Sequence, residues 1–259
     1  MKHKYILLSF AILLMLTLNG CLNPGGSPGG ISPGPPPGSS PGTSPGNTPG
    51  TANGTITGRV VDATSGLAFW SGQASLAGKT VQISDGQFEF KNIPAGRHTL
   101  TVCKAHYQTA EVQVNIGAQP STVDVKMRPV YSAAHLDLFA RLVHAESRGE
   151  PYEGQVAVAA SVLNRVQHHN YPSSLYGVIT QRDSRGYAQY SPIDNGAINT
   201  PAARSAKDAV ADALVGWDPS RGATGFFAPA KVPNRNNWVW KQVPLVKIGN
   251  HQFFRSQLD

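Results

Sequence analysis

A glutamate at position 146 is the strongest candidate for chemistry in this sequence of 259 residues. Three apolar residues precede it with a spacing that puts them on one face of a helix, and they are Leu136, Phe139 and Val143. Glu146 is the next position on that face. A carboxyl group that continues an apolar face loses water when the face packs, so its pKa rises and it keeps a proton near neutral pH. Such a group can serve as a general acid.

The same spacing allows a second interpretation of Glu146. In this alternative the side chain lies in a frayed last turn of the helix and pairs with Arg148 or Arg141 in water. Both arginines are close enough in sequence for such a pair. Periodicity alone leaves the two interpretations open.

A second carboxylate is present in most glycosidases, where an acid acts together with a nucleophile or base. Glu150 follows four residues later, but Gly149 and Pro151 interrupt the helix and remove the argument that both acids share a face. Glu153 fits better as a negative residue in the first turn of the next helix. The spacing therefore gives little support for a pair of acids.

Histidines near this glutamate raise the alternative of a zinc-dependent peptidase or amidase built on His144, Glu146 and His251. His144 and Glu146 are two residues apart and face different sides of a helix. The sequence has no HExxH motif and no Cys and His spacing of a zinc site. We therefore expect no metal and no cofactor, and we keep a metal-dependent amidase as an alternative.

The elements around Glu146 are mostly helical. Ser132 can cap a helix over residues 134–147, and the apolar run 153–166 predicts a helix at the centre of its domain, with Asn164 as its polar exception. A short helix follows Ser173 and Ser174 and extends to residue 179. Thr200 and Pro201 predict the start of another helix, which ends at Gly216. Gly-Asn between residues 245–248 and 251–254 predicts a hairpin.

The segment 54–129 has a period of two, which is typical of strands. Alternation occurs over residues 55–61, 87–90, 99–102, 111–114 and 123–126 and predicts a small antiparallel β-sandwich. Phe88 and Phe90 fit its core, and by parity Cys103 lies on the face opposite Leu100 and Val102.

The N-terminus has the pattern of an export signal. Lys2 and Lys4 precede an uncharged apolar run over residues 5–18, which is too short for a comfortable membrane span. The run ends in Leu18-Asn19-Gly20-Cys21, which resembles a bacterial lipobox. We expect a signal peptide over residues 1–20, a lipid anchor on Cys21 and an exported protein held at the membrane, facing the cell wall.

Residues 21–53 predict a disordered tether, because they consist largely of Pro, Gly and Ser. The whole chain has 22 Lys and Arg against 15 Asp and Glu, a net charge of +7. This excess favours an anionic partner such as a wall polymer or a membrane surface. We expect no nucleic acid partner, because basic residues interleaved with aromatic ones are absent from the sequence.

The C-terminal part resembles the spore cortex-lytic enzyme family of cell wall hydrolases. The likeness begins in residues 138–166, which read LFARLVHAESRGEPYEGQVAVAASVLNRV, and continues through residues 176–179, 189–192, 194–196, 209–218 and 247–251. It implies a lysozyme-like domain over residues 132–257. The predicted fold is therefore a small antiparallel β-sandwich followed by a mainly α (α+β) lysozyme-like catalytic domain. Two departures are Ser147, where the family usually has Ala, and Asn195.

The resemblance also implies a reaction. Members of the family cleave peptidoglycan glycan strands, of cell wall or spore cortex, as lytic transglycosylases, and their catalytic glutamate falls on Glu146. The muramic acid C6 hydroxyl attacks its own C1 and leaves a 1,6-anhydromuramyl end, so one carboxyl group can both donate and accept the proton. A wall-binding or sporulation lipoprotein without catalysis is the alternative.

Weaker candidates for binding the sugar strand lie downstream. Gln189, Tyr190 and Ser191 stand in a loop that suits hydrogen bonds to N-acetyl sugars. Phe227 and Trp238 have faces on which sugars can stack, although large aromatic residues more often belong to a core.

The segment 54–129 is similar to the carboxypeptidase regulatory-like domains. The likeness rests on residues 58–62, 86–100 and 106–107. It implies a spacer or contact module, and the segment shows no catalytic constellation.

Overall fold

The computed structural model describes residues 53–257 of the chain. The predicted signal peptide over residues 1–20, the lipidation site Cys21 and the predicted tether up to residue 52 lie outside the described residues. Among the helices that are described, none is both long enough and apolar enough to span a membrane.

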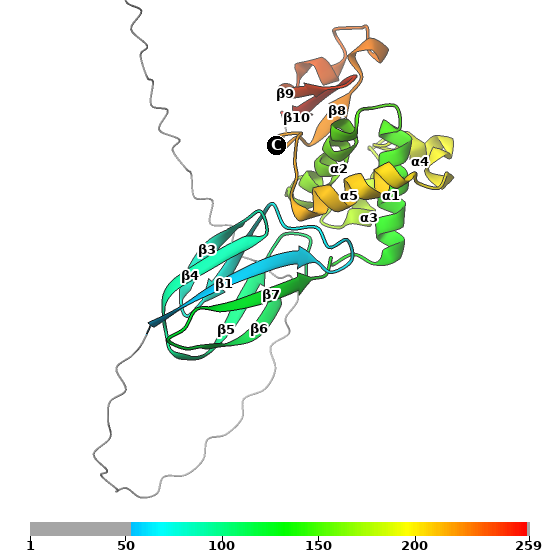
Figure 1. Cartoon of the computed structure of the whole chain (residues 1–259). Helices are drawn as coiled ribbons and strands as arrows, with labels where there is room; N and C mark the ends of the chain where they lie inside the picture. The colour runs from blue at the N-terminus through cyan, green and yellow to red at the C-terminus, as the bar shows by residue number, and fades with distance from the viewer. Residues whose placement is uncertain (1–52, 258–259) are drawn as a thin grey trace, which may run out of the picture. The chain divides into compact units, whose positions relative to one another are not determined.

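The first part of the described chain is a β domain of seven strands (Figure 1). Its strands are β1 Asn53–Asp62, β2 Ser71–Leu76, β3 Lys79–Ser84, β4 Gln87–Pro94, β5 Gly96–Cys103, β6 Ala110–Ile116 and β7 Ser121–Met127. They form one sheet in the order β6-β5-β2-β3-β4-β1-β7. The sheet is nearly closed, since its two edge strands β6 and β7 come into contact.

The expected β domain is confirmed, with two differences in detail. β1 pairs with β7 in parallel, whereas the other pairings of the sheet are antiparallel. β2 and β3 were not predicted, because each carries few apolar residues among polar ones and gives a weak alternation.

The core of the β domain follows the predicted parity. Phe88 and Phe90 are buried, as are Leu100 and Val102 on β5. Cys103 is half-buried on the other face, with its Sγ 3.9 Å from the hydroxyl of Thr109. The prediction of an inward Phe pair and an outward cysteine is confirmed.

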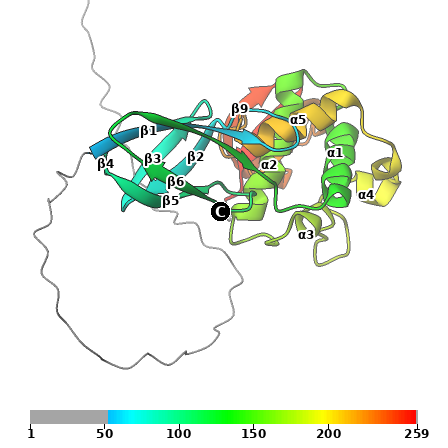
Figure 2. The same cartoon turned by 60° about the horizontal axis from the view of Figure 1, so that its bottom comes forward.

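The second part of the described chain is mainly helical (Figure 2). Its α-helices are α1 Ala133–Ser147, α2 Tyr152–Gln167, α3 Leu175–Ile179, α4 Pro192–Asn195 and α5 Arg204–Val215. Short 3₁₀ turns are η1 Ala197–Asn199, η2 Pro229–Lys231 and η3 Trp238–Lys241. The side chain of Ser132 accepts the amide of His135 at the start of α1, as the sequence predicts.

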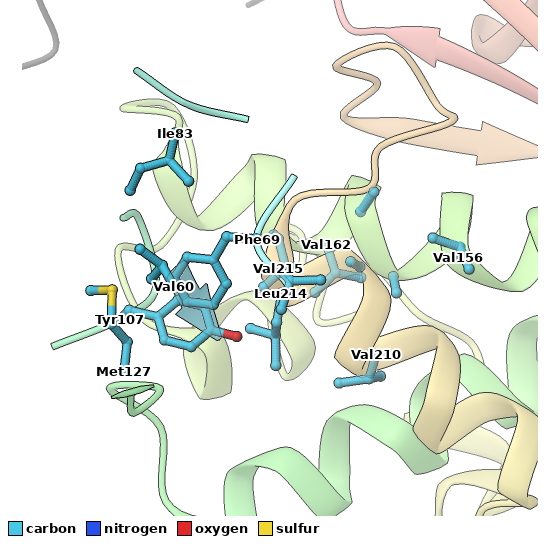
Figure 3. Packing of buried hydrophobic residues seen from close by; sticks show 14 of the residues in the cluster. Val60, Phe69, Ile83, Tyr107, Met127, Val156, Val162, Val210, Leu214 and Val215 are labelled. Carbon is cyan, nitrogen blue, oxygen red and sulfur yellow. The ribbon is translucent and has the colours of Figure 1, made fainter. Parts of the chain in front are cut away.

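Helix α2 lies at the centre of this domain. Every residue from Gly154 to Leu163 is buried, and α2 contacts α1, α3 and α5. Figure 3 shows members of this apolar core, among them Val156 and Val162 of α2 with Val210 and Leu214 of α5. The prediction of a central helix is confirmed, because a helix that is apolar on nearly all sides must be covered on all of them.

Helix α5 begins later than the sequence predicts. Thr200 closes the η1 turn by donating its amide to the Ala197 carbonyl, and Ala203, with extended backbone, is the N-cap. The predicted N-cap at Thr200 is therefore wrong, because that residue already completes the preceding turn. The predicted end is right, since Gly216 adopts φ 112° at the C-cap, a conformation that favours glycine.

The predicted hairpin is present and forms part of a sheet. β9 Val243–Ile248 pairs with β10 His251–Arg255 in antiparallel register, with His251 opposite Ile248. β8 Gly225–Phe227, which was not predicted, adds to the other edge of β10. The sheet has the order β8-β10-β9.

The polar exception on α2 fixes the loop that leads into β8. Asn164 donates from its side-chain nitrogen to a carboxylate oxygen of Asp218 and to the carbonyl of Ala223. The Asp218 carboxylate also accepts the backbone amides of Ser220 and Gly222. A half-buried amide in the central helix is thus paired on both of its donor bonds.

We predict that Asn164→Ala lowers the free energy of unfolding by about 2 kcal/mol, because it leaves the carbonyl of Ala223 without its donor. Chemical denaturation monitored by circular dichroism measures this change. Gln113→Ala, which removes an exposed side-chain hydrogen bond on the β domain, is the control and should cost less than about 0.5 kcal/mol. Equal effects of the two substitutions would refute this account of the loop.

Candidate active site

Glu146 lies in the last turn of α1 and is half-buried. The face that it continues packs as predicted, with Phe139 and Val143 fully buried and Leu136 partly buried. Burial raises the pKa of the Glu146 carboxyl to about 7, and the positive charge of Lys231 opposes this rise. The carboxyl group is thus divided between its protonated and ionised forms at neutral pH.

The alternative pairing of Glu146 with an arginine is not seen. Arg141 pairs with Asp137 at 3.0 Å and donates to the carbonyl of Ile198. Arg148 is exposed. Within residues 53–257, Glu146 forms no ion pair.

Tyr190 is a close electrostatic neighbour of Glu146. Only 4% of Tyr190 is exposed, and its hydroxyl has no hydrogen-bond partner among the described residues. Its pKa is raised, chiefly by burial, and the charges of Arg165 and Glu146 act on it in opposite directions. The Arg165 guanidinium lies over the Tyr190 ring, 5.2 Å from its centre, and forms a cation–π contact with it.

Two basic residues near this site come from the last part of the chain, His251 at the start of β10 and Lys231 at the end of η2. The ring of His251 lies 5.1 Å from that of Phe226, and its Nδ1 has no partner within the described part of the chain. Burial lowers the pKa of His251, and Lys231 lowers it further, whereas Glu150 raises it. Lys231 thus acts on both Glu146 and His251, although these residues are 105 positions apart in the sequence.

Glu150 has a structural task that sequence reasoning did not find. Its carboxylate accepts the backbone amide of Asn250 at 2.7 Å and the side-chain amide of the same residue at 3.1 Å. These bonds hold the turn of the β9–β10 hairpin, where Gly249 has φ 56°. Local sequence patterns could not indicate this role of Glu150, because its partner Asn250 lies 100 residues further along the chain. Glu153 is exposed in the first turn of α2, as expected.

The other candidates for sugar binding differ in exposure. Gln189 and Ser191 are exposed on either side of the buried Tyr190. Phe227 is 9% exposed and packs edge-on against Trp240 at 4.8 Å. Trp238 is 59% exposed and offers the largest free aromatic face of this group.

The residues of the metal alternative do not gather into a ligand set. Among residues 53–257, no three His, Cys, Asp or Glu side chains lie close enough together to hold a metal ion. His144 is half-buried in α1, and His251 faces the ring of Phe226.

Residues 149–254 match the cell wall hydrolase family. We call the C-terminal domain that contains this match the hydrolase domain. Glu146 lies just before the matched region. The hydrolase domain includes α2, which is buried at its centre, and the three-stranded sheet that carries His251.

Two curated relatives are similar to the hydrolase domain. A spore cortex-lytic enzyme of Bacillus cereus is 40% identical over 123 residues, which are 48% of this chain and 45% of that protein. A spore cortex-lytic enzyme of Bacillus subtilis is 37% identical over 123 residues, which are 48% of this chain and 38% of that protein. The chain spans less than half the length of these relatives.

A solved structure is also similar in this region. The catalytic domain of a germination-specific lytic transglycosylase of Bacillus anthracis is 38% identical. The match covers 49% of this chain and 98% of that domain, with a TM-score of 0.44.

We predict that Glu146→Gln stabilises the protein relative to wild type at pH 7 and above but not at pH 4. The folded-state pKa of about 7 exceeds the ordinary value of 4.5, so the folded state binds this proton more tightly than the unfolded state. Ionisation therefore destabilises the wild type as pH rises through this interval, by about 3 kcal/mol above pH 7. Glutamine cannot ionise and avoids this cost.

Unfolding by urea at pH 4 and at pH 8 measures the difference between wild type and Glu146→Gln. The variant should gain relative stability at pH 8 and lose that gain at pH 4. Glu153→Gln, at an exposed position, is the matched control. A difference between Glu146→Gln and wild type that does not change with pH would show that the carboxyl is fully hydrated.

Proposed function

We propose that the protein is a peptidoglycan lytic transglycosylase that cleaves the bond between N-acetylmuramic acid and N-acetylglucosamine, in which Glu146 is both acid and base. The observation that carries the proposal is a half-buried carboxyl group with a pKa of about 7 and no ion pair in the described structure. Such a group can hold a proton for the leaving oxygen and take one back afterwards.

The absence of a second acid at this site among the described residues favours this reaction over ordinary hydrolysis. Inverting and retaining glycosidases need two carboxyl groups on either side of the scissile bond. The nearest acid in sequence, Glu150, is engaged with Asn250 through both of its oxygens. An internal attack by the muramic acid C6 hydroxyl needs no second carboxylate, because Glu146 accepts the proton of that hydroxyl after giving its own to the leaving oxygen.

Tyr190, Gln189 and Ser191 are proposed to bind the sugar strand beside Glu146. The charge of Glu146 contributes to the raised pKa of Tyr190, and the Tyr190 hydroxyl lacks a partner in the described part of the chain. Gln189 and Ser191 offer exposed amide and hydroxyl groups on either side of it. Trp238 is proposed to stack on a sugar with its exposed face. Phe227 is buried in β8 and is proposed to contribute by packing against Trp240.

The rest of the chain is proposed to bring this domain to its substrate. Lipidation of Cys21 would anchor the exported protein on the membrane, with residues 22–53 as a tether towards the cell wall. The β domain is proposed to act as a spacer or contact module, in line with its resemblance to carboxypeptidase regulatory-like domains. Peptidoglycan and the membrane are the proposed partners, and we propose none among nucleic acids.

We predict that purified protein converts peptidoglycan into fragments with 1,6-anhydromuramyl ends and that Glu146→Gln lowers this rate by at least about a hundredfold. Mass spectrometry of the digest measures the products. Glu150→Gln is the matched control. It removes a carboxylate four residues away in the sequence and leaves the proposed acid in place. Wild-type protein that releases no anhydromuramyl products would favour the wall-binding lipoprotein, and release of free peptides would favour the amidase.

We predict that Cys21→Ser abolishes incorporation of a labelled fatty acid and shifts the protein from the membrane fraction to the soluble fraction. Cys103→Ser is the control, because Cys103 is the other cysteine of the chain and should not affect labelling. Unchanged membrane association of an unlabelled wild type would contradict the lipid anchor.

A further inference from the structure

The end of the hydrolase domain has a one-sided charge. Between residues 219 and 257 the sequence contains no Asp or Glu, and it contains the basic residues Arg221, Lys231, Arg235, Lys241, Lys247 and Arg255. Three of these cations lie in residues 229–242, which we call the basic arm. A segment with only one sign of charge attracts a ligand of the opposite sign.

The basic arm is fastened to the sheet that carries His251. Trp240 donates from its indole nitrogen to the carbonyl of Val232 at 3.0 Å and packs edge-on against Phe227 of β8. Trp238 packs edge-on against Phe254 of β10, with ring centres 6.1 Å apart. The cations of the arm therefore project from a backbone that is held at both η2 and η3.

The cations of the basic arm have no acidic partner of their own. Lys231, Arg235 and Lys241 are exposed, and none of them forms an ion pair within the described residues. The Arg235 guanidinium lies 3.8 Å from the centre of the Trp240 ring, which fixes its plane and leaves its hydrogen-bond donors free. A planar, fixed guanidinium suits a carboxylate, which it can bind through two parallel hydrogen bonds.

The sheet that holds the basic arm lies beside the end of α1, because the carboxylate of Glu150, four residues after Glu146, accepts both amide groups of Asn250 in the β9–β10 turn. The charge of Lys231 also acts on Glu146 and His251. An anion bound there must belong to a sugar beside the cleaved bond. In peptidoglycan such anions are the carboxylates of the peptide stem, which is joined to the lactyl group of muramic acid through an amide bond. A phosphate polymer attached to the C6 oxygen is excluded as this ligand, because that oxygen is the attacking group of the proposed reaction.

We propose that the basic arm binds the carboxylates of the peptide stem of peptidoglycan and so makes the enzyme select strands whose muramic acid carries an acidic stem. This inference rests on the proposed function and adds a substrate preference to it. Lys231 contacts the stem close to the muramic acid, and Arg235 and Lys241 contact it further out.

The test compares two forms of one peptidoglycan preparation. One form is native, and in the other the free carboxyl groups are converted to methylamides, which removes their charge and keeps the peptide. We expect wild-type kcat/KM to be about tenfold higher on the native form at low salt, mainly through a lower KM. The ratio of the two values should approach one as ionic strength rises, because the cations are exposed.

Variants assign this preference to the basic arm. In the double variant Lys231→Gln/Arg235→Gln the ratio should fall to about two or less. In Lys231→Gln/Arg235→Lys, which keeps one of the two charges, the ratio should lie between that value and the wild-type ratio. The control Lys91→Gln/Lys126→Gln makes the same charge change at exposed positions of the β domain and should keep the wild-type ratio. Because each ratio compares two substrates within one variant, any effect of Lys231 on the pKa of Glu146 cancels.

The outcomes separate this inference from the proposed function. Anhydromuramyl products formed at equal kcat/KM from both forms would overturn the stem preference and leave the transglycosylase intact. An equal loss of preference in the control variant would assign the effect to overall charge and overturn the role of the basic arm. A wild type that forms no anhydromuramyl product from either form would overturn the proposed function itself, and with it this inference.

A third substrate locates the carboxylates. Treatment of peptidoglycan with an amidase removes the stem and leaves a free lactyl carboxylate in its place. We expect kcat/KM on this form to fall close to the value for the methylamide form. A value equal to that for native strands would move the contact from the stem to the lactyl carboxylate and overturn the proposal as stated.

Discussion

The removal of water from one carboxyl group is the constraint on which the chemistry of this protein depends. Helix α1 places Glu146 at the end of its apolar face, and the packing of that face on the central helix holds the side chain half out of solvent. A carboxylate in water would be ionised at neutral pH and could not donate a proton. The fold therefore sustains an unfavourable ionisation at this position, which native structures tolerate mainly at functional sites.

The charge of Lys231 sets an opposite limit on the same group. Burial alone would move the pKa of Glu146 further upward, and the ammonium group counteracts that movement. An acid that must also act as a base works best when its pKa is near the working pH, because both protonation states are then populated. The position of η2 beside the sheet thus matters for the acid as well as for any anionic substrate group.

Much of this arrangement could be predicted from the sequence, because it depends on local patterns. The ends of α1, the central position of α2 and the β9–β10 hairpin follow from caps, periodicity and a Gly-Asn turn. The burial side of Glu146 follows from the spacing of Leu136, Phe139 and Val143. Tyr190 was a candidate only as a polar loop residue, and neither its burial near Glu146 nor the role of Lys231 could be predicted, because both residues come from distant segments without a periodic pattern. The start of α5 was also missed, since Thr200 serves the turn before it.

Hydrogen bonding separates the acids that support the fold from the one available for chemistry. Asp218 accepts bonds from Asn164, Ser220 and Gly222, and Glu150 uses both oxygens on Asn250. Bonds of this kind fix the side chain, so a group that makes them would have to break them before it could move to a substrate. Glu146 combines partial burial with the absence of an ion pair in the described structure, so its proton can be exchanged without first breaking a structural bond. For the same reason Glu150, although only four residues away, serves as a control for loss of a carboxylate rather than as a second catalyst.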